Sequence, residues 1–212
     1  MNSSTHVRRG LIDKRHSILT AALTVFGREG YIGSSIESIS TVAGVSTRTV
    51  YNHFEDKADL FQTTIHSSAT EVADAQLELI DRHLGALPAD TDIEAALVAF
   101  AIEWTATVTR FSDHFALVRQ LPTEAAHLPR SAIDAWLRTG PLRVRRELAH
   151  HFRRLASIGL LALDDADTAA QHFSVLTATA IPPFYCHIAP SEEDVRKAVL
   201  ASVRAFLYGY CS

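Results

Sequence analysis

The sequence predicts an all-α protein, and three observations favour this class. Apolar residues return every three or four positions along much of the 212-residue chain, which is the period of a helix buried on one face. Alternating apolar and polar runs of useful length, the pattern of strands, do not occur. Nine Gly and seven Pro are few for a turn-rich β architecture, and 47% hydrophobic side chains can bury one or two cores.

The first helix is predicted over residues 11–29, because an apolar stripe there ends at Gly30, a residue that commonly stops helices. The second is predicted to begin at Ser34 or Ser35. Either hydroxyl can cap a helix, and Ser34 stands in capping-box spacing with Glu37.

The second helix is predicted to end at Gly44, and a short third helix to run from Ser46 or Thr47 to about Phe54. Asp56 is expected to cap a long fourth helix. The remaining helices are predicted over 57–84, 92–110, 113–127, 130–157 with a break at 139–141, 165–181 and 191–208.

Two short helices joined by a tight glycine turn form the helix-turn-helix arrangement, whose second helix lies in the major groove of DNA. Ala43 is small enough for the helices to approach, and Gly44 permits the positive φ of the turn. Apolar Val45, Val50 and Phe54 are expected to bury the corner. The residues expected on the outer face are Thr47, Arg48, Thr49, Asn52 and His53.

This outer face has the chemistry of duplex recognition. Hydroxyl, amide and imidazole groups reach phosphate oxygens, while Arg48 can bind guanine and Asn52 can bind adenine. The hydroxyl of Tyr51 is placed to contact phosphate. Lys57 joins the positive N-terminal end of the fourth helix against the DNA backbone.

Charge is divided unevenly along the chain. Residues 1–54 hold six Lys or Arg against three Asp or Glu, a balance of +3, so the other 158 residues hold −7 of the total −4. Proteins that bind nucleic acid without sequence preference are usually basic overall. The balance therefore indicates a small basic N-terminal part and an acidic remainder.

The stretch FGREGYIGSSIESISTVAGVSTRTVYNHFEDKADLF, residues 26–61, resembles the DNA-binding domain of the tetracycline-repressor (TetR) family of regulators. The resemblance implies a homodimer of all-helical subunits. It implies a helix-turn-helix DNA-binding domain over residues 1–56 and a ligand-binding and dimerisation domain over 57–212, connected by the helix at 57–84.

The same resemblance assigns roles on the DNA-binding face. Thr47, Arg48, Thr49 and Asn52 occupy positions that read bases. The residues at positions that hold phosphate are Ser35, Tyr51, His53 and Lys57, and Ser34 is also predicted to be DNA-binding. Arg48 stands where the family often has a small residue, and Ser40 replaces the usual Ala, so the operator sequence cannot be borrowed.

The later part of the chain resembles the C-terminal domains of AefR-like members through HFALVRQLPTEAAHLP, GPLRVRRELAHHF and GLLALDDADTAAQHF. Family pockets lie between the fifth and eighth helices, with Arg119 and His172 as the polar anchors here. Aromatic residues at helical spacing are also common in ordinary cores, and an arginine there is as often paired to a carboxylate. The predicted ligand-contacting residues are Phe100, Trp104, Val108, Phe111, Phe115, Arg119, Trp136, His172 and Phe173.

The helices at 165–181 and 191–208 are implied to form the interface of an isologous homodimer. Their apolar stripes contain Phe173, Leu176, Val199, Val203, Phe206 and Leu207. Between them, the prolines of residues 181–190 interrupt any helix, and this segment is expected to shape the interface or cover a pocket. Cys186 lies in it, and its role is open.

No metal, cofactor or membrane segment is expected. Neighbouring His150 and His151 point about 100° apart on a helix, and the two cysteines lack metal-site spacing. No apolar run approaches the roughly 18 residues of a membrane span, and the first residues lack the apolar core of a signal peptide. The expected location is the cytoplasm.

The predicted function is a ligand-responsive transcriptional repressor that binds a palindromic DNA operator and is released by a small-molecule effector. Two alternatives are weighed. A helical enzyme is disfavoured because G-x-S-x-G, P-loop, GxGxxG and H-E-x-x-H motifs are lacking. A nonspecific DNA-binding protein is disfavoured by the net charge of −4.

Overall fold

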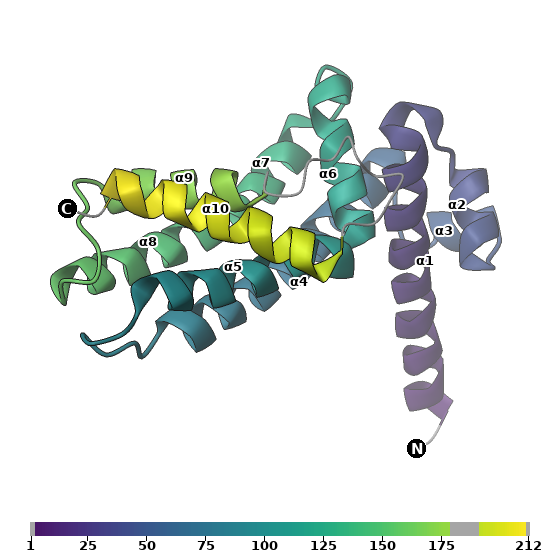
Figure 1. Cartoon of the computed structure of the whole chain (residues 1–212). Coiled ribbons are helices and arrows are strands. Elements are labelled where there is room, and N and C mark those ends of the chain that lie inside the picture. Colours follow the sequence, from purple (N-terminus) through teal and green to yellow (C-terminus); the bar gives the residue numbers. More distant parts are fainter. Residues whose placement is uncertain (1–2, 179–190, 211–212) are drawn as a thin grey trace. The chain divides into compact units, whose positions relative to one another are not determined.

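The computed structural model describes residues 3–178 and 191–210, with backbone only for 3–11 and 209–210, and every regular element in these ranges is a helix (Figure 1). The all-α prediction is confirmed. The helices are α1 (Ser3–Gly33), α2 (Ile36–Ala43), α3 (Thr47–Tyr51), α4 (Lys57–Leu84), α5 (Ile93–Arg110), α6 (Ser112–Glu124), α7 (Arg130–Thr139), α8 (Pro141–Ser157), α9 (Ala166–Ala178) and α10 (Glu192–Tyr210).

The helices form two compact units. Unit 1 comprises Met1–Val72 and Phe111–Gly140, and unit 2 comprises Ala73–Arg110 and Pro141–Ser212. These units do not divide at the predicted boundary between residues 56 and 57, because α4 contributes to both and α6 and α7 pack in unit 1. The close approach of α6 to α1 explains the grouping: a Cβ atom at Gly27 would lie 3.2 Å from the Cβ of Ala116.

The core of unit 1 is built around three aromatic rings. The Phe61 ring of α4 meets the rings of Phe26 and Tyr31 edge-on, with centroids 5.1 and 5.0 Å away. Val50 of α3 and Leu117 of α6 are buried in the same cluster. The short helices of the N-terminal part are therefore held by burial against the longer α1 and α4, since helices of this length are marginal alone.

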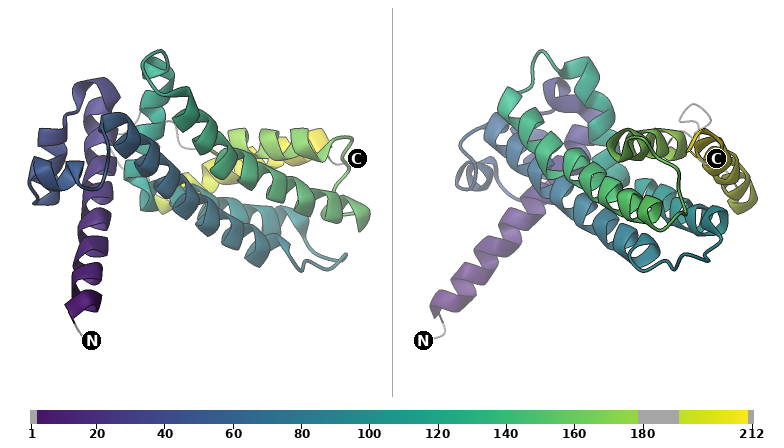
Figure 2. Two further views of the ribbon diagram at one scale, coloured as in Figure 1. Left: turned by 180° about the vertical axis from the view of Figure 1, so that it is seen from behind. Right: turned by 90° about the vertical axis from the view of Figure 1, so that its left-hand side faces the viewer.

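The core of unit 2 contains the second part of α4 with α5, α8, α9 and α10, which the two views of Figure 2 show running beside one another. Its centre is aromatic. The Phe173 ring lies 5.5 Å from Phe100, 5.6 Å from Phe152 and 5.3 Å from Phe206, centroid to centroid.

Most predicted helices are found, with differences at their ends. The first begins at Ser3 rather than residue 11, and Gly30 interrupts it with φ 72° and ψ 174°. The third ends at Tyr51 rather than about residue 54. The break predicted at 139–141 falls at Gly140.

The ninth helix is predicted over 165–181, and α9 covers Ala166–Ala178. The rest of that range, the proline-rich segment 181–190 and Cys186 lie outside the described residues. Within the described ranges, no helix combines the length and the apolar character needed to cross a membrane.

Candidate nucleic-acid interface

The second helix starts at Ser35, which settles the choice between two neighbouring serines. The Oγ of Ser35 accepts the main-chain N–H of Ser38 at 3.0 Å, and the Oγ of Ser38 accepts the N–H of Ser35 at 3.2 Å. This reciprocal pair is a capping box. The pairing of Ser34 with Glu37 that the spacing suggested is wrong, because Ser34 is buried and its hydroxyl donates to the carbonyl of Tyr31.

The turn between α2 and α3 depends on Gly44. Its φ of 67° and ψ of 31° lie in the left-handed region, where a Cβ is unfavourable. The N–H of Gly44 bonds to Thr41 and that of Val45 to Ser40, at 3.2 and 3.0 Å, and closes α2. Ser46 then caps α3 by accepting the N–H of Thr49 at 3.1 Å. The corner predicted from the sequence is confirmed.

The outward face of α3 carries exposed polar side chains, whereas the hydroxyl of Thr49 at its edge lies 2.9 Å from that of Ser46. Val50 is fully buried and holds the inner face of α3. On the outer side, Arg48 and Asn52 are exposed and Tyr51 is 54% exposed. Arg48 makes no ion pair with any residue that the structure describes. Its guanidinium is therefore available to a ligand outside the chain.

The remaining candidates for phosphate contact differ in accessibility. Ser35, Thr47, Thr49 and His53 are half-buried at the edge of the same face. Ser34, at 5% exposure, is not brought to the surface that the others form.

Lys57, at the start of α4, is partly occupied inside unit 1. Its Nζ donates to the carbonyl of Ser34 at 2.5 Å and lies 4.7 Å from the ring centroid of Tyr31. Burial lowers the pKa of Lys57, and the nearby Glu124 carboxylate opposes part of that shift. The ammonium group thus helps to hold the end of α1, and its predicted phosphate contact stays a prediction.

Asp56 caps α4, as expected from the sequence. Its Oδ1 accepts the N–H of Asp59 at 2.8 Å, and the carboxylate of Asp59 accepts the N–H of Glu55 at 3.0 Å. Both carboxylates thus accept main-chain donors at the start of α4, as a capping residue does.

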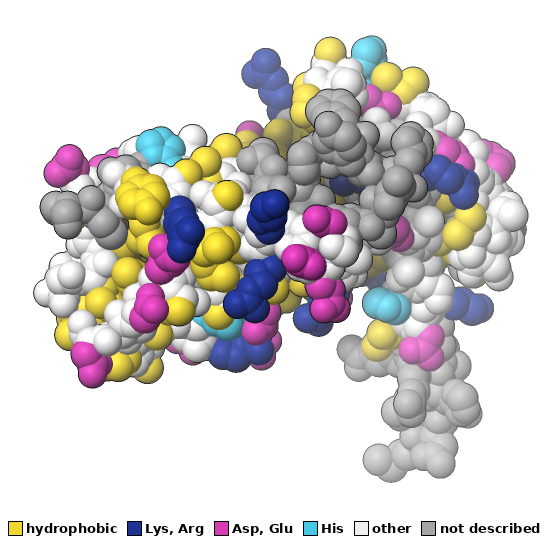
Figure 3. All heavy atoms as spheres, viewed as in Figure 1, with side chains coloured by type: hydrophobic (Ala, Val, Ile, Leu, Met, Phe, Trp, Pro, Cys, Tyr) yellow, Lys and Arg dark blue, Asp and Glu magenta, His cyan; other side chains and the backbone are white. Residues whose placement is uncertain are grey.

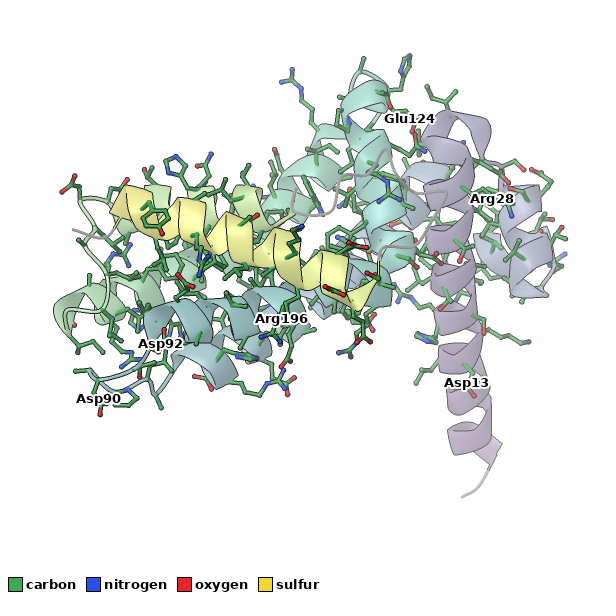
Figure 4. The ribbon with its side chains drawn as sticks, viewed as in Figure 1. Asp13, Arg28, Asp90, Asp92, Glu124 and Arg196 are labelled. Atoms are coloured by element: carbon green, nitrogen blue, oxygen red, sulfur yellow. The ribbon has the colours of Figure 1, made fainter. Side chains whose placement is uncertain are left out.

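Two carboxylates of α6 hold α1, and nothing local in the sequence indicated either. Glu124 accepts the main-chain N–H groups of Tyr31 and Ile32 at 2.6 and 3.1 Å, immediately after the break at Gly30 (Figure 4). Asp113 accepts the hydroxyl of Thr24 at 2.6 Å. We call these contacts the α1–α6 junction. Partners about 90 residues apart leave no spacing pattern.

A buried histidine links α6 to α4 in the same unit. The Nδ1 of His114 lies 2.9 Å from the hydroxyl of Ser68, and only 5% of His114 is exposed. Burial lowers the pKa of His114 to about 4. The ring is therefore neutral at pH 7 in the folded protein.

The nine predicted ligand-contacting residues are divided between the two units. Unit 1 contains Phe111, Phe115, Arg119 and Trp136, and unit 2 contains Phe100, Trp104, Val108, His172 and Phe173. Phe100 and Phe173 are fully buried and stack on each other, so they build the core of unit 2. Trp104 and Val108 are 7% and 38% exposed.

The apolar stripes predicted to meet a second subunit are largely used within one subunit. Phe173, Val199, Val203, Phe206 and Leu207 are each at most 7% exposed in the core of unit 2. The reason is that α9 and α10 pack against α8 and α5 along these stripes. Among the described residues, no three His, Cys, Asp or Glu side chains form a group suited to a metal ion.

Comparison with known proteins agrees with this geometry. Residues 18–64 match the model of the bacterial regulatory proteins of the tetR family, and residues 95–212 match that of the AefR-like transcriptional repressor C-terminal domain. The chain is 38% identical over 78 residues to the transcriptional repressor NicS of Pseudomonas putida, which is 35% of this chain and 37% of NicS. The chain spans between 23% and 37% of the length of the curated relatives that it matches.

Solved structures match over nearly the whole chain. A TetR-family regulator from Mesorhizobium loti MAFF303099 is 29% identical with a TM-score of 0.78, covering 94% of this chain and 98% of that one. The flavonoid-responsive regulator FrrA is 25% identical with a TM-score of 0.63, covering 93% and 96%. A helix-turn-helix corner with a free, polar recognition face, followed by a matching C-terminal domain, identifies the chain as a member of the TetR family of non-enzymatic transcriptional regulators, with an AefR-like C-terminal domain.

Proposed function

We propose that the protein is a homodimeric repressor that binds a palindromic operator through α3 and is released by a small-molecule effector in the cytoplasm. The observation that carries the proposal is the guanidinium of Arg48 on the exposed face of α3, which forms no ion pair with the residues that the structure describes. Thr47, Thr49 and Asn52 lie on the same short helix or at its C-cap, so base contacts are concentrated there. Ser35, Tyr51, His53 and Lys57 supply phosphate contacts that fix the helix in the major groove.

The homodimer interface uses the faces of α9 and α10 that unit 2 does not bury. On α10, Ala201 and Ala205 are exposed four residues apart, and Tyr208 is 81% exposed three residues later. Small side chains allow two helices to approach closely, and a tyrosine beside them supplies apolar area and a hydroxyl. A twofold axis there would give each partner the same surface, as an isologous dimer requires.

The effector shifts the population from the DNA-binding conformation of the dimer to a conformation that does not bind the operator. It binds the conformation whose two recognition helices no longer match successive major grooves, which lie about 34 to 36 Å apart. Effector and operator affinities are then linked reciprocally. The similarity to FrrA, named flavonoid-responsive, supports a small organic effector. In unit 2, Val108 is 38% exposed and lies one helical turn after the nearly buried Trp104 on α5, so these two side chains offer apolar contact to such a molecule.

Selection of duplexes from a random pool, followed by mobility-shift assays, tests the operator proposal. We expect the wild-type protein to enrich a palindrome. Arg48→Ala should lose about 1 to 3 kcal/mol for the preferred base and relax specificity at that position. Arg130→Ala, an exposed arginine of α7, is the matched control and should bind as wild type. Enrichment of no palindrome would contradict the proposal.

A further inference from the structure

The N-terminal part of α1 extends well past the core of unit 1. Ile18 is the first residue that the structure shows to be buried, and every residue from 12 to 17 is exposed. At about 1.5 Å per residue, the 15 residues from Ser3 to Ser17 add roughly 22 Å of helix. Figure 1 shows this end of α1 continuing beyond α2 and α3. We call residues 3–17 the basic extension.

The basic extension has the charge of a polyanion-binding surface. It contains Arg8, Arg9, Lys14 and Arg15 against the single acid Asp13, a balance of +3 in 15 residues. No acidic residue precedes Asp13. Lys14 is exposed and makes no ion pair with any described residue.

Three exposed arginines of unit 2 form ion pairs with acidic residues, unlike Lys14 of the basic extension. Arg82 bonds to Glu103 at 2.9 Å, Arg153 to Asp167 at 2.6 Å and Arg204 to Glu94 at 2.9 Å. Over the face of unit 2 in Figure 3, Lys and Arg side chains lie beside Asp and Glu. Those cations are balanced within the fold, whereas the charge of the extension has no such acidic neighbours along its sequence.

The extension adjoins the proposed DNA-contacting face. The guanidinium carbon of Arg15 lies 5.3 Å from the ring centroid of Phe54, and Phe54 directly follows His53, just after the end of α3. Arg15 therefore places the exposed part of the extension beside the side of unit 1 that contains the predicted phosphate contacts.

We propose that the basic extension is a second DNA-contacting surface, which binds backbone phosphates of the duplex beside the half-site that α3 reads. The inference rests on the proposed function. Duplex DNA carries one negative charge per about 1.7 Å of its axis, so a 22 Å helix passes roughly a dozen phosphates. Phosphate contacts add affinity without sequence information. The extension therefore strengthens binding and lengthens the contacted DNA, and leaves base preference to α3.

A charge-neutral variant tests the proposal. Arg8→Gln, Arg9→Gln and Lys14→Gln are combined, and Arg15 is kept because it contacts Phe54. The control combines Arg130→Gln, Arg138→Gln and Arg146→Gln, three exposed arginines of α7 and α8, so that both variants lose the same charge. Affinity for the duplex selected by the wild-type protein is measured by fluorescence anisotropy across salt concentrations.

For the extension variant we expect the salt slope to fall in magnitude by about 0.9 for each phosphate that the variant no longer neutralises, up to about 2.7 per subunit. Its base preference should be unchanged. Removing the DNA that flanks the palindrome should weaken wild-type binding and leave the variant's affinity nearly the same. The control variant should keep the wild-type slope.

An unchanged slope in the extension variant would overturn the inference. A changed oligomeric state in sedimentation, with an unchanged slope, would show that the extension binds the acidic part of a second copy and would overturn it equally. If the wild-type protein selects no palindrome, the proposed function fails on its own. The slopes of the two variants on random duplex still decide whether the extension binds phosphate.

Discussion

The helix-turn-helix corner and the α1–α6 junction lie in the same compact unit but are held in different ways. In the corner, Ser35 pairs with Ser38, Gly44 with Thr41 and Ser46 with Thr49, each three residues away, and the bond of Val45 to Ser40 spans five. In the junction, Glu124 reaches Tyr31 across 93 residues and Asp113 reaches Thr24 across 89.

This difference predicts which contacts persist when a distant part of the chain is altered. The corner forms wherever its own residues and a buried surface for Val50 are present. The junction exists only while α6 is in place against α1. The segment between Gly30 and Ser34 therefore depends on a helix far away in the sequence. The carbonyl of Ser34 in this segment also accepts a hydrogen bond from the ammonium group of Lys57.

Gly30→Ala should break the junction and have the largest effect on stability. The φ of 72° and ψ of 174° at Gly30 lie in a region almost confined to glycine, and an added Cβ would lie 2.5 Å from Oε1 of Glu124. Strain and the displaced carboxylate together should lower the free energy of unfolding by at least about 3 kcal/mol. Denaturant unfolding measures this loss. In the control Gly33→Ala, an added Cβ would lie 3.9 Å from the Cβ of Glu29 and φ is not positive, so the loss should stay within about 1 kcal/mol.

Acid should weaken the contact between α6 and α4. The pKa of His114 is about 4 in the folded protein and 6.5 in an unfolded chain. Between these values the unfolded chain binds more protons, so stability falls as the pH drops from 6.5 towards 4. The loss attributable to His114 between pH 7 and pH 5 should be about 2 kcal/mol.

Unfolding of His114→Gln at both pH values checks this. The variant should lose about 2 kcal/mol less than wild type on acidification. His66→Gln, which replaces an exposed histidine of α4, should behave as wild type. Equal losses in all three proteins would show that His114 does not carry the pH dependence.

Gly44→Ala tests the corner and should have a smaller effect than Gly30→Ala. The φ of 67° is unfavourable for alanine, but nothing lies within 4 Å of an added Cβ. The free energy of unfolding should fall by about 1 to 2 kcal/mol. Asparagine tolerates this left-handed conformation, so Gly44→Asn should restore most of the stability, whereas Gly30→Asn should not improve on Gly30→Ala.

Lys57→Ala tests whether Lys57 serves the DNA-contacting face or the end of α1, and it has the smallest expected effect on stability. If Lys57 contacts phosphate, affinity should fall for every duplex sequence and the salt slope should decrease by about 0.9. If it serves only the end of α1, affinity should fall by the same factor at every salt concentration. Anisotropy titrations over a salt series distinguish these outcomes, with Lys57→Arg as the charge-conserving control.

The corner could be predicted because its signals are local. Ala43, Gly44 and the spacing of Val45 and Val50 define the turn, and the structure confirms it. The N-cap of α2 was ambiguous, since Ser34 and Ser35 have the same chemistry and only burial distinguishes them. The early start of α1 was not predicted, because residues 3–10 lack an apolar stripe.

In the C-terminal part, the apolar periodicity correctly predicted helices but did not show which surfaces their apolar faces contact. The stripes on α9 and α10 were predicted to meet a second subunit, yet Phe173, Val203 and Phe206 fill the core of unit 2. A period of 3.6 residues shows that one face of a helix is buried. It does not show what buries it.

The helical class, the order of the helices, the recognition corner and its resemblance to one family of regulators could all be predicted from the sequence, because periodicity, caps and turns depend on residues that are close together in the chain. Three features could be seen only in the folded structure. Helices α6 and α7 pack in the N-terminal unit, Glu124 holds the segment after Gly30, and Lys57 bonds inside the fold. Each of these depends on residues distant in sequence meeting through packing, and packing leaves no mark at a fixed spacing.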